Sequence, residues 1–242
     1  MEDLNRFCRK ETKYIIGEEQ YKYISEILCD NGMNMDKYGK SLVASLYFDT
    51  PDYRIIRRSM EKPKYKEKLR IRTYGVPGDD TDAFCEIKKK YKGIVYKRRV
   101  KMPYGEALDW LCSGDKVVSR SQIQKEIEYN RDHYPGIAPS VIILYDRVAY
   151  YSSVDQGLRV TFDTNVRYRF DSLDLRCGDF GEVLIGEGQY IMEVKRQGAI
   201  PLWLSHALGC GGVYPVSYSK YANAYIKEYY KRLKTEVFSY AK

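Results

Sequence analysis

The chain has 242 residues, a formal net charge of +8 at pH 7 and 44% hydrophobic residues. This length and apolar content suit one globular domain with a substantial core, so we expect residues 1–242 to form a single domain. No apolar run reaches the roughly 18 residues that a membrane span needs, and the N-terminal residues lack the pattern of a signal peptide. We therefore expect a cytoplasmic protein without a direct membrane span.

The first half of the chain is predicted to begin with a strand and a helix and to continue as a meander of strands. Residues 6–16 alternate polar and apolar side chains, residues 18–31 have helical spacing, and Asn31-Gly32 is a usual helix stop. Turn-rich segments then separate the β-rich runs. The predicted strands of this half are 42–49, 66–74, 83–91 and 94–102.

The second half is predicted to alternate helices and strands. Pro135-Gly136 ends a helical segment, and Asp155-Gln156-Gly157 indicates a hairpin. We predict helices at 104–112, 120–134, 201–208 and 217–233, strands at 141–152 and 157–169, a loop at 171–181, and a hairpin or two short strands within 182–196.

Cysteine and histidine usage argues against zinc and disulfide chemistry. The six cysteines have no CxxC spacing, which predicts free thiols in a reducing compartment. The two histidines, His133 and His206, are expected to be ordinary packing or surface residues. A histidine base or a histidine-ligated zinc is therefore not expected.

Basic side chains recur at every second position on eight strand-like segments, several with a carboxylate two residues away. Examples are KLRIR at 68–72, EIKKK at 86–90 and KRRVK at 97–101. Residues i and i+2 share one face of a strand, so this spacing predicts a sheet face built of Lys and Arg. Such a face suits a ligand with many negative charges, and the neighbouring glutamates indicate a metal bound with it.

Two arrangements place these residues differently. An open sheet would expose the basic face to water and pack the Leu69/Ile71 face on helices. A closed sheet would put the cations in a lumen and pack the apolar residues against an outer layer of helices. We favour the second arrangement, an α+β fold in which an antiparallel eight-stranded β-barrel tunnel is surrounded by helices.

A series of short motifs resembles the VTC domain, a polyphosphate polymerase domain of the triphosphate tunnel metalloenzyme (CYTH-like) superfamily. The similarity spans about residues 6–225. The motifs are RKETKY at 9–14, YFDT at 47–50, KLRIRTY at 68–74, EIKKKYKGIVYKRR at 86–99, LYDRVAY at 144–150, LRVTFDT at 158–164, MEVK at 192–195 and SKY at 219–221.

The resemblance implies a tunnel that binds a triphosphate together with a divalent metal, Mn²⁺ or Mg²⁺. It further implies transfer of the γ-phosphoryl group of ATP to a growing inorganic polyphosphate chain. The positions that it marks for phosphate binding and catalysis are Lys13, Arg70, Arg72, Lys88, Lys97, Arg147, Arg159 and Lys220. Further candidate phosphate ligands on the same inferred face are Arg9, Arg99 and Lys195.

Glu193 falls at the metal-binding glutamate of the resembled family, with Glu11 and Glu86 as further metal candidates. Each of these two can instead orient neighbouring cations through salt bridges. Arg9 stands where the wider superfamily has the first glutamate of Glu-x-Glu-x-Lys, and this departure resembles the VTC branch rather than the triphosphatase branch.

Three functions remain open from the sequence. The first is an ATP-dependent polyphosphate polymerase, and the second is a metal-dependent triphosphatase that hydrolyses a nucleoside or inorganic triphosphate. The third is a non-catalytic polyphosphate-binding module. The tyrosine-rich composition can also serve base stacking, but no RNA-binding motif accompanies it, and nucleic acid is not an expected partner.

Overall fold

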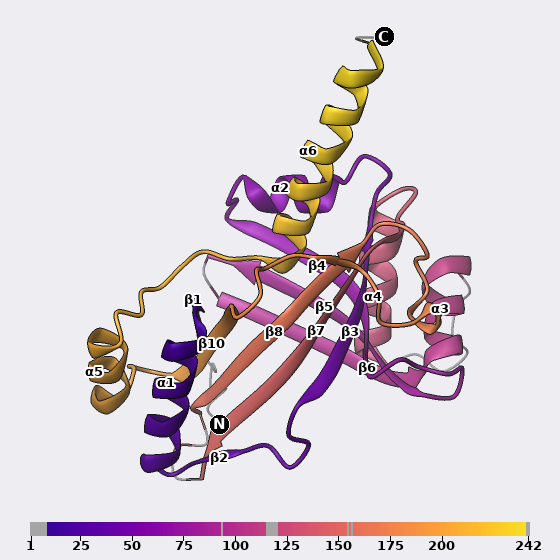
Figure 1. Ribbon diagram of the computed structural model, residues 1–242. Helices are drawn as coiled ribbons and strands as arrows, with labels where there is room; N and C mark the ends of the chain where they lie inside the picture. Colours follow the sequence, from indigo (N-terminus) through magenta and orange to yellow (C-terminus); the bar gives the residue numbers. More distant parts are fainter. Residues whose placement is uncertain (1–8, 93, 115–120, 154, 156, 241–242) are drawn as a thin grey trace.

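The computed structural model describes residues 9–92, 94–114, 121–153, 155 and 157–240 (Figure 1). Its strands form one ten-stranded sheet in which every pairing is antiparallel. The strands are β1 (Arg9–Ile16), β2 (Met33–Met35), β3 (Ser41–Asp49), β4 (Tyr65–Tyr74), β5 (Asp82–Tyr91), β6 (Ile94–Pro103), β7 (Ala138–Ser152), β8 (Arg159–Arg169), β9 (Glu182–Val183) and β10 (Tyr190–Gln197). The predicted α+β class with an antiparallel sheet is confirmed.

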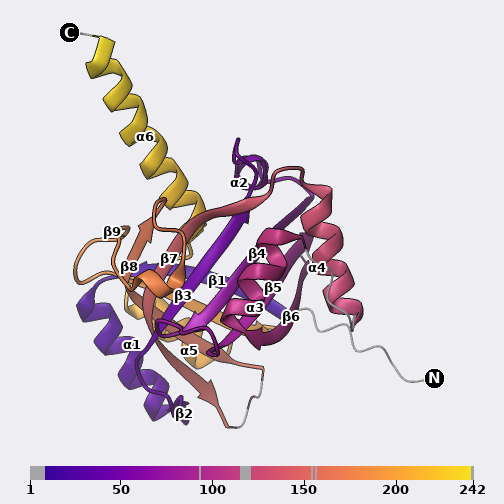
Figure 2. The same cartoon turned by 90° about the vertical axis from the view of Figure 1, so that its right-hand side faces the viewer.

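Eight of these strands follow one another in the order β1-β10-β8-β7-β3-β4-β5-β6, while β2 pairs with β7 and β9 with β8. The sheet curls so that its end strands, β1 and β6, approach each other (Figure 2). Among the described residues no hydrogen-bonded pairing joins β1 to β6. The prediction of a fully closed barrel is therefore wrong at this seam, although the curled, tunnel-like wall is present.

Helices surround the sheet on several sides (Figure 1). They are α1 (Glu18–Asp30), α2 (Arg54–Met60), α3 (Tyr104–Ser113), α4 (Gln122–His133), α5 (Leu202–Cys210) and α6 (Lys220–Tyr240), with a single 3₁₀ turn at Leu175–Cys177. Local signals explain two of the starts. Ser121 caps α4 by accepting a hydrogen bond from the backbone N–H of Gln124, and Ser219 caps α6 in the same way through Ala222.

Helix α2 was not predicted, because its N-terminus is capped from outside the helix. The carboxylate of Asp49, at the end of β3, accepts hydrogen bonds from the backbone N–H groups of Ile55 and Ile56 at 2.8 and 3.0 Å. These donors have no partner within the helix. A cap six residues before its donor gives no local sequence signal.

The segment 182–196 does not form a hairpin. Strands β9 and β10 both pair with β8, at opposite ends of that strand, and not with each other. The alternative prediction of two short strands is correct. Helix α6 also runs to Tyr240, beyond the predicted end at 233.

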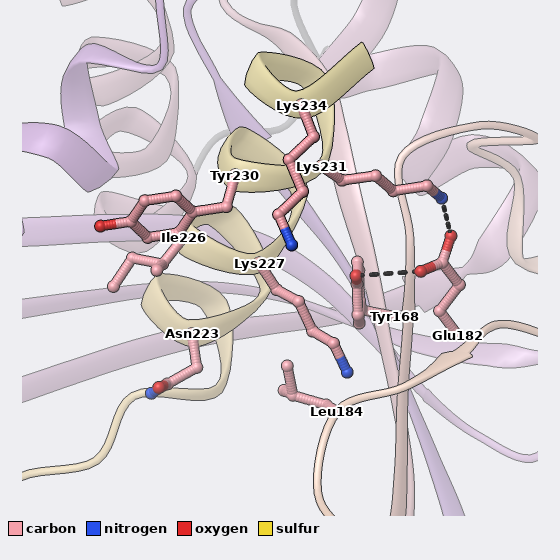
Figure 3. A pocket seen from close by; sticks show the side chains of 9 residues that line it. All are labelled: Tyr168, Glu182, Leu184, Asn223, Ile226, Lys227, Tyr230, Lys231 and Lys234. Carbon is pink, nitrogen blue, oxygen red and sulfur yellow. Dashed lines mark hydrogen bonds and ion pairs between the residues drawn. The ribbon is translucent and has the colours of Figure 1, made fainter. Parts of the chain in front are cut away.

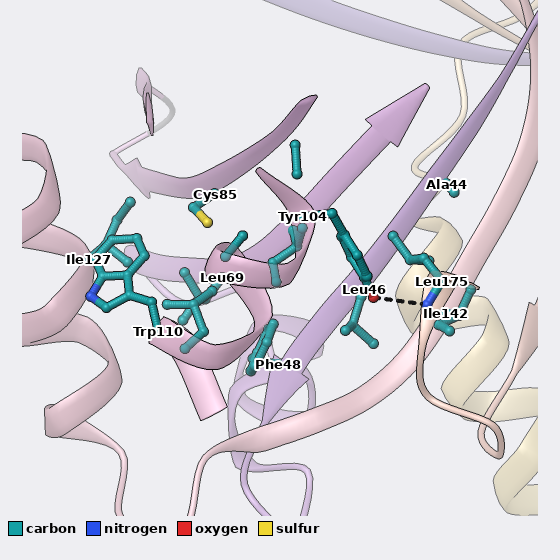
Figure 4. Close-up of a cluster of buried hydrophobic side chains, with 14 of the residues drawn as sticks. Ala44, Leu46, Phe48, Leu69, Cys85, Tyr104, Trp110, Ile127, Ile142 and Leu175 are labelled. Atoms are coloured by element: carbon teal, nitrogen blue, oxygen red, sulfur yellow. Dashed lines mark hydrogen bonds between the residues drawn. The ribbon is translucent and has the colours of Figure 1, made fainter. Parts of the chain in front are cut away.

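The outward faces of β4 and β5 carry the apolar side chains, as the alternation predicts. Leu69, Ile71 and Ile87 are fully buried against α3 and α4, where Trp110 and Ile127 meet them (Figure 4). Full burial of each such side chain contributes roughly 1.5–3 kcal/mol. A second cluster on β8 and β10 packs under α1 and α5. The basic faces therefore lie on the other, inner side of the sheet.

The inner face itself is apolar at one end. A third buried cluster unites Val43 and Tyr47 of β3 and Ile143 of β7 with Tyr221 and Ala224 of α6. Strand β3 thus contributes no cation to the inner face, contrary to the expectation of basic side chains on every strand. Within the described residues, no helix combines the length and apolar character needed to cross a membrane.

Candidate functional site

Strand register brings charged side chains from seven strands onto one inner face. Lys13 lies opposite Glu193 in the β1–β10 pair, Arg147 opposite Asp163 in the β7–β8 pair, and Arg70 opposite Glu86 in the β4–β5 pair. Because alternate residues share a face, their neighbours at i±2 join them. The set comprises Glu11, Lys13, Lys68, Arg70, Arg72, Glu86, Lys88, Lys97, Arg147, Asp163, Glu193 and Lys195.

Glu193 is the centre of one charge cluster. Lys195 donates to its Oε2 at 2.8 Å, the Nζ of Lys13 is 3.2 Å from Oε1, and Arg147 and Lys220 follow at 3.8 and 3.9 Å. The side chain is 8% exposed. Burial alone would raise its pKa, but these cations outweigh burial and hold the pKa well below the usual value. Glu193 is therefore an anion held among cations.

Asp163 fixes two of those cations. Its carboxylate accepts two hydrogen bonds from Arg147, at 2.5 and 2.7 Å, and one from Lys220 at 2.5 Å. Its side chain is fully buried. Burial acts to raise its pKa, but Arg147 and Lys220 lower it overall. Lys220 is the first residue of α6, so Asp163 ties the start of this helix to β8.

Glu86 organises the opposite part of the wall. Arg70 donates to its Oε2 through Nε at 2.8 Å and Nη2 at 2.6 Å, and Lys97 bridges to its other oxygen. Burial acts to raise the pKa of Glu86, but Arg70, Arg72 and Lys97 lower it to about 2. The geometry favours the second of the two roles considered for Glu86, which is to orient cations.

Hydroxyl groups complete the positioning of the arginines. Tyr47 accepts a hydrogen bond from Nη1 of Arg70 at 2.8 Å. Arg72 donates to the hydroxyls of Ser45 at 3.2 Å and Tyr145 at 3.1 Å. These three residues were not predicted. Tyr145 could have been found two residues before Arg147, at the i−2 position of the same strand face.

The β4–β6 part of the wall has more cation than its carboxylate balances. Burial lowers the pKa of Lys68 to about 8. Burial also lowers that of Lys97 to about 8, with Arg70 adding to the effect. For Tyr47, burial acts to raise the pKa, but Arg70, Arg72 and Lys68 lower it to about 7. This part of the wall therefore carries a surplus of positive charge.

The YFDT and SKY motifs meet beside the cluster. The hydroxyl of Tyr221 donates to Oδ2 of Asp49 at 2.8 Å and lies 3.1 Å from Ser140 Oγ. The same Asp49 caps α2. Because Tyr221 follows Lys220 directly, this contact anchors the turn of α6 that presents Lys220. Ser219, just before it, accepts a hydrogen bond from Lys68 at 3.0 Å.

Side chains and one loop span the seam between the end strands. Lys88 of β5 donates to Glu11 of β1 at 3.3 Å. The backbone N–H of Val216 donates to the carbonyl of Lys13 at 2.7 Å, on the edge of β1 that β10 leaves free. The seam is therefore held without a strand–strand ladder.

Not every predicted residue joins the cluster. The Arg159 side chain is 47% exposed and lies 3.7 Å from Asp36. Arg99 is exposed, with its guanidinium 4.8 Å from the ring centre of Phe84. Arg9 lies on β1 opposite Gln197, but its side chain is outside the described residues. Lys195, in contrast, contacts Glu193 directly.

The carboxylates differ in their fitness to hold a divalent metal. Asp163 and Glu86 are each occupied by two cationic side chains. Glu193 and Glu11 lie on adjacent strands of one face and share Lys13, at 3.2 and 3.6 Å. No group of three metal-ligating side chains occurs in the described part of the chain. A Mg²⁺-like ion needs only one or two carboxylates when phosphate oxygens supply the rest, and Glu193 with Glu11 fits that requirement.

Cysteine and histidine behave nearly as predicted. The five described cysteines are free thiols, while Cys8 lies outside the described residues. One relation was missed. Cys210 follows His206 by one helical turn, and its Sγ lies 3.7 Å from Nε2. Both side chains are exposed at α5, away from the inner face.

Several solved structures are similar to this chain. A proposed adenylate cyclase from Bacillus halodurans is 14% identical over 88% of this chain and 95% of its own, with a TM-score of 0.50. A proposed adenylyl cyclase from Hippeastrum, described as having a dominant triphosphatase activity, is 15% identical over 88% of this chain and 92% of its own, with a TM-score of 0.49. The Mimivirus capping enzyme triphosphatase is 14% identical over 85% and 89%, with a TM-score of 0.35.

At these identities the first of these structures shows a shared fold and nothing more. No curated protein matches the chain. The family model of the VTC domain, however, matches residues 8–229. That match includes every strand of the inner face and the start of α6. On this match the chain belongs to the VTC domain family.

Proposed function

We propose that this protein is a polyphosphate polymerase that transfers the γ-phosphoryl group of ATP to a growing polyphosphate chain with the help of a divalent metal. The observation that carries the proposal is the inner face itself, where cations from β1, β4, β5, β6, β7 and β10 and the start of α6 surround few carboxylates. Membership of the VTC family supports it.

The described cations supply what phosphoryl transfer asks of a protein, which is positioning and charge stabilisation. Arg70 and Arg147 are held by carboxylates through their forks, which leaves their remaining N–H groups to grip phosphate oxygens. Lys13, Lys88 and Lys195 act as point charges. We assign Lys13, Arg70, Arg72, Lys88, Lys97, Arg147, Lys195 and Lys220 to phosphate binding, and place the exposed Arg159 and Arg99 at the margins.

Glu193, with Glu11 beside it, would hold the divalent metal. When bound, the metal supplies positive charge to the triphosphate oxygens as charge develops on them. A triphosphate arriving at this face would take over Lys13 and Lys195, which now neutralise Glu193. That exchange would free the carboxylate oxygens for the metal.

The acceptor is the terminal phosphate of the polymer, whose oxygens are already anionic. The reaction therefore needs no strong general base. The side chains that contact Glu193 and Glu86 directly are cations, and the carboxylates among them have lowered pKa values, which suits a reaction without a strong base. We further propose a cytoplasmic location, which the free state of the described cysteines supports.

The test is direct. Purified protein is incubated with ATP and Mn²⁺ or Mg²⁺, and the products are separated on a gel stained for polyphosphate, with released orthophosphate measured in parallel. A ladder of polyphosphate supports polymerase activity. Orthophosphate without polymer identifies a triphosphatase. Metal-dependent binding of polyphosphate with no consumption of ATP identifies a non-catalytic module.

A further inference from the structure

Outside the tunnel, one large cavity opens between α6 and the edge of the sheet formed by β8 and β9 (Figure 3). Its volume is about 550 Å³. The lining residues are Tyr168, Glu182, Leu184, Asn223, Ile226, Lys227, Tyr230, Lys231 and Lys234. None of them belongs to the inner-face cluster, so the cavity is a separate feature.

The helix side of this cavity is basic. Lys227, Lys231 and Lys234 follow one another at i, i+4 and i+7, a spacing that puts them on one face of α6. In Figure 3 the side chains of Lys227 and Lys231 extend from the helix toward Leu184 and Glu182 and that of Lys234 runs along the helix, whereas Tyr230 and Ile226 extend the other way. Glu182 is the one carboxylate of the lining.

The cavity keeps more positive than negative charge. Glu182 pairs with Lys231 and accepts a hydrogen bond from Tyr168 at 3.2 Å. Lys227 donates to the carbonyl of Val183 at 2.6 Å, which holds its ammonium group in the cavity. Lys234 is exposed. Among the lining residues, three ammonium groups therefore face one carboxylate, in a space large enough for several phosphate groups. Outside the lining, Glu228 and Asp171 add to the effect of Glu182 in raising the pKa of Lys231, so part of this positive charge is balanced from beside the cavity.

The same helix connects this cavity to the tunnel. Lys220, at its first position, is buried against Asp163. With about 100° of rotation per residue, Lys220 and the three cavity lysines fall within a sector of about 60° on α6. With a rise of about 1.5 Å per residue, Lys227 and Lys234 lie about 10 and 21 Å beyond Lys220 along the axis. The helix leads away from the sheet in this direction (Figures 1 and 2).

We propose that the cavity along α6 is a second anion site, which binds the extended part of an inorganic polyphosphate chain outside the tunnel. This inference rests on the proposed function, because the polyphosphate made by that activity would be long enough to reach from the tunnel to the cavity. Point charges spaced along a helix suit a flexible chain of repeating phosphates. A single triphosphate bound in the tunnel would not reach them.

The experiment replaces the three cavity lysines with alanine, which keeps helix propensity high. The control variant replaces Lys22, Lys37 and Lys40, three exposed lysines away from α6, and so loses the same charge. The probes are long-chain inorganic polyphosphate and inorganic tripolyphosphate. We measure binding of the long chain with the tunnel saturated by tripolyphosphate, and binding of tripolyphosphate alone.

We expect the cavity variant to bind the long chain about tenfold more weakly and to bind tripolyphosphate within about twofold of wild type. A second variant with Lys227→Gln, Lys231→Gln and Lys234→Gln should show the same two affinities. It controls for a folding defect in the alanine variant. The control variant should resemble wild type. An unchanged affinity for the long chain in both cavity variants would overturn the proposal, and so would an equal loss in the control.

Two further outcomes are decisive. A single-stranded DNA oligonucleotide that binds the wild-type cavity more tightly than polyphosphate would show that the site serves nucleic acid instead, and would overturn our assignment. The proposed polymerase activity fails separately, because it is judged from polymer formation by wild-type protein. If the cavity binds long-chain polyphosphate but the protein makes no polymer, only the proposed polymerase activity is contradicted.

Discussion

The two halves of the tunnel wall use their carboxylates differently. On the β1–β10–β8–β7 side, Glu193 lies among four cations at 2.8 to 3.9 Å, and Glu11 is beside it. On the β3–β4–β5–β6 side, the carboxylate of Glu86 is engaged at both oxygens by Arg70 and Lys97. Under the proposed function, the first half would supply Glu193 and Glu11 to a metal, and the second half would orient cations toward the triphosphate through Glu86. We call the first half the metal wall and the second the phosphate wall, although Lys13, Arg147 and Lys195 of the metal wall are proposed to bind phosphate as well.

The pKa values follow this division in part. On the first side, burial acts to lower the pKa of Lys13, but Glu193 and Glu11 raise it overall, whereas burial lowers the pKa of Lys195 despite the opposing effect of Glu193. On the second side, burial lowers the pKa of Lys68 and Lys97 to about 8. Charge is balanced on the first wall and in excess on the second.

The largest effect is expected from Glu193→Gln, which tests the metal wall. The amide keeps the size of the side chain but removes the charge that a divalent ion requires. We expect metal-dependent turnover to fall by about 100-fold or more, measured as ATP consumption over a range of Mn²⁺ concentrations. Glu187→Gln, an exposed glutamate in the loop before β10, is the control. Turnover that stays near wild type with an unchanged metal requirement would remove Glu193 from this role.

Glu86→Gln tests the phosphate wall. Without the carboxylate, Arg70 and Lys97 lose the partner that orients them. We expect tripolyphosphate affinity to fall about tenfold, with little change in the concentration of metal that half-saturates the enzyme. Calorimetric titration gives the first quantity and metal-dependent kinetics the second. A change in metal requirement as large as that of Glu193→Gln would erase the distinction between the walls.

An effect of similar size is expected from pH. Lys68 and Lys97, with pKa values of about 8, are charged at pH 7 and largely neutral at pH 9. Tyr47, with a pKa of about 7, gains negative charge over the same range. All three changes weaken anion binding, so tripolyphosphate affinity should fall roughly tenfold between pH 7 and pH 9.

Two measurements check the origin of this pH dependence. Binding at pH 8 should take up protons, because the bound anion favours charged lysines, and titrations in two buffers of different ionisation enthalpy report the uptake. Replacing Lys68 and Lys97 with arginine should flatten the profile, since arginine stays charged. If tripolyphosphate affinity depends on pH in the double arginine variant as it does in wild type, titration of Lys68 and Lys97 is not its cause.

The smallest effect is expected from Tyr221→Phe, which loosens the contact that places Lys220 between the walls. The variant keeps the ring but loses the hydrogen bond to Asp49, at a cost of about 1 kcal/mol in the free energy of unfolding. We expect turnover to fall a few-fold with unchanged metal dependence.

A double-mutant cycle with Lys220→Ala separates positioning from general destabilisation. If Tyr221 acts through Lys220, its substitution should have no further effect on turnover once Lys220 is gone. An equal loss in both backgrounds would mean that Tyr221 contributes only to stability. Tyr190→Phe, which loses a hydrogen bond to Glu18 outside both the tunnel and the cavity, is the matched control.

The sequence by itself determined the antiparallel sheet, the outward packing of Leu69 and Ile71, and the inner position of Lys13, Arg70 and Glu193. These follow from the two-residue period of strands, which can be read from neighbouring residues in the sequence. Periodicity also predicted Arg99 on the same face, but it could not tell the middle of a strand face from its exposed margin.

Only the tertiary structure decided the contacts between segments distant in sequence. Asp49 caps α2 and receives the hydroxyl of Tyr221 from 172 residues away. Asp163 joins Arg147 to Lys220, and Lys88 reaches Glu11 across a seam that no strand ladder closes. Strand alternation fixes which face a side chain occupies, whereas its partner depends on strand order, curvature and the entry of α6, which arise when the whole chain packs.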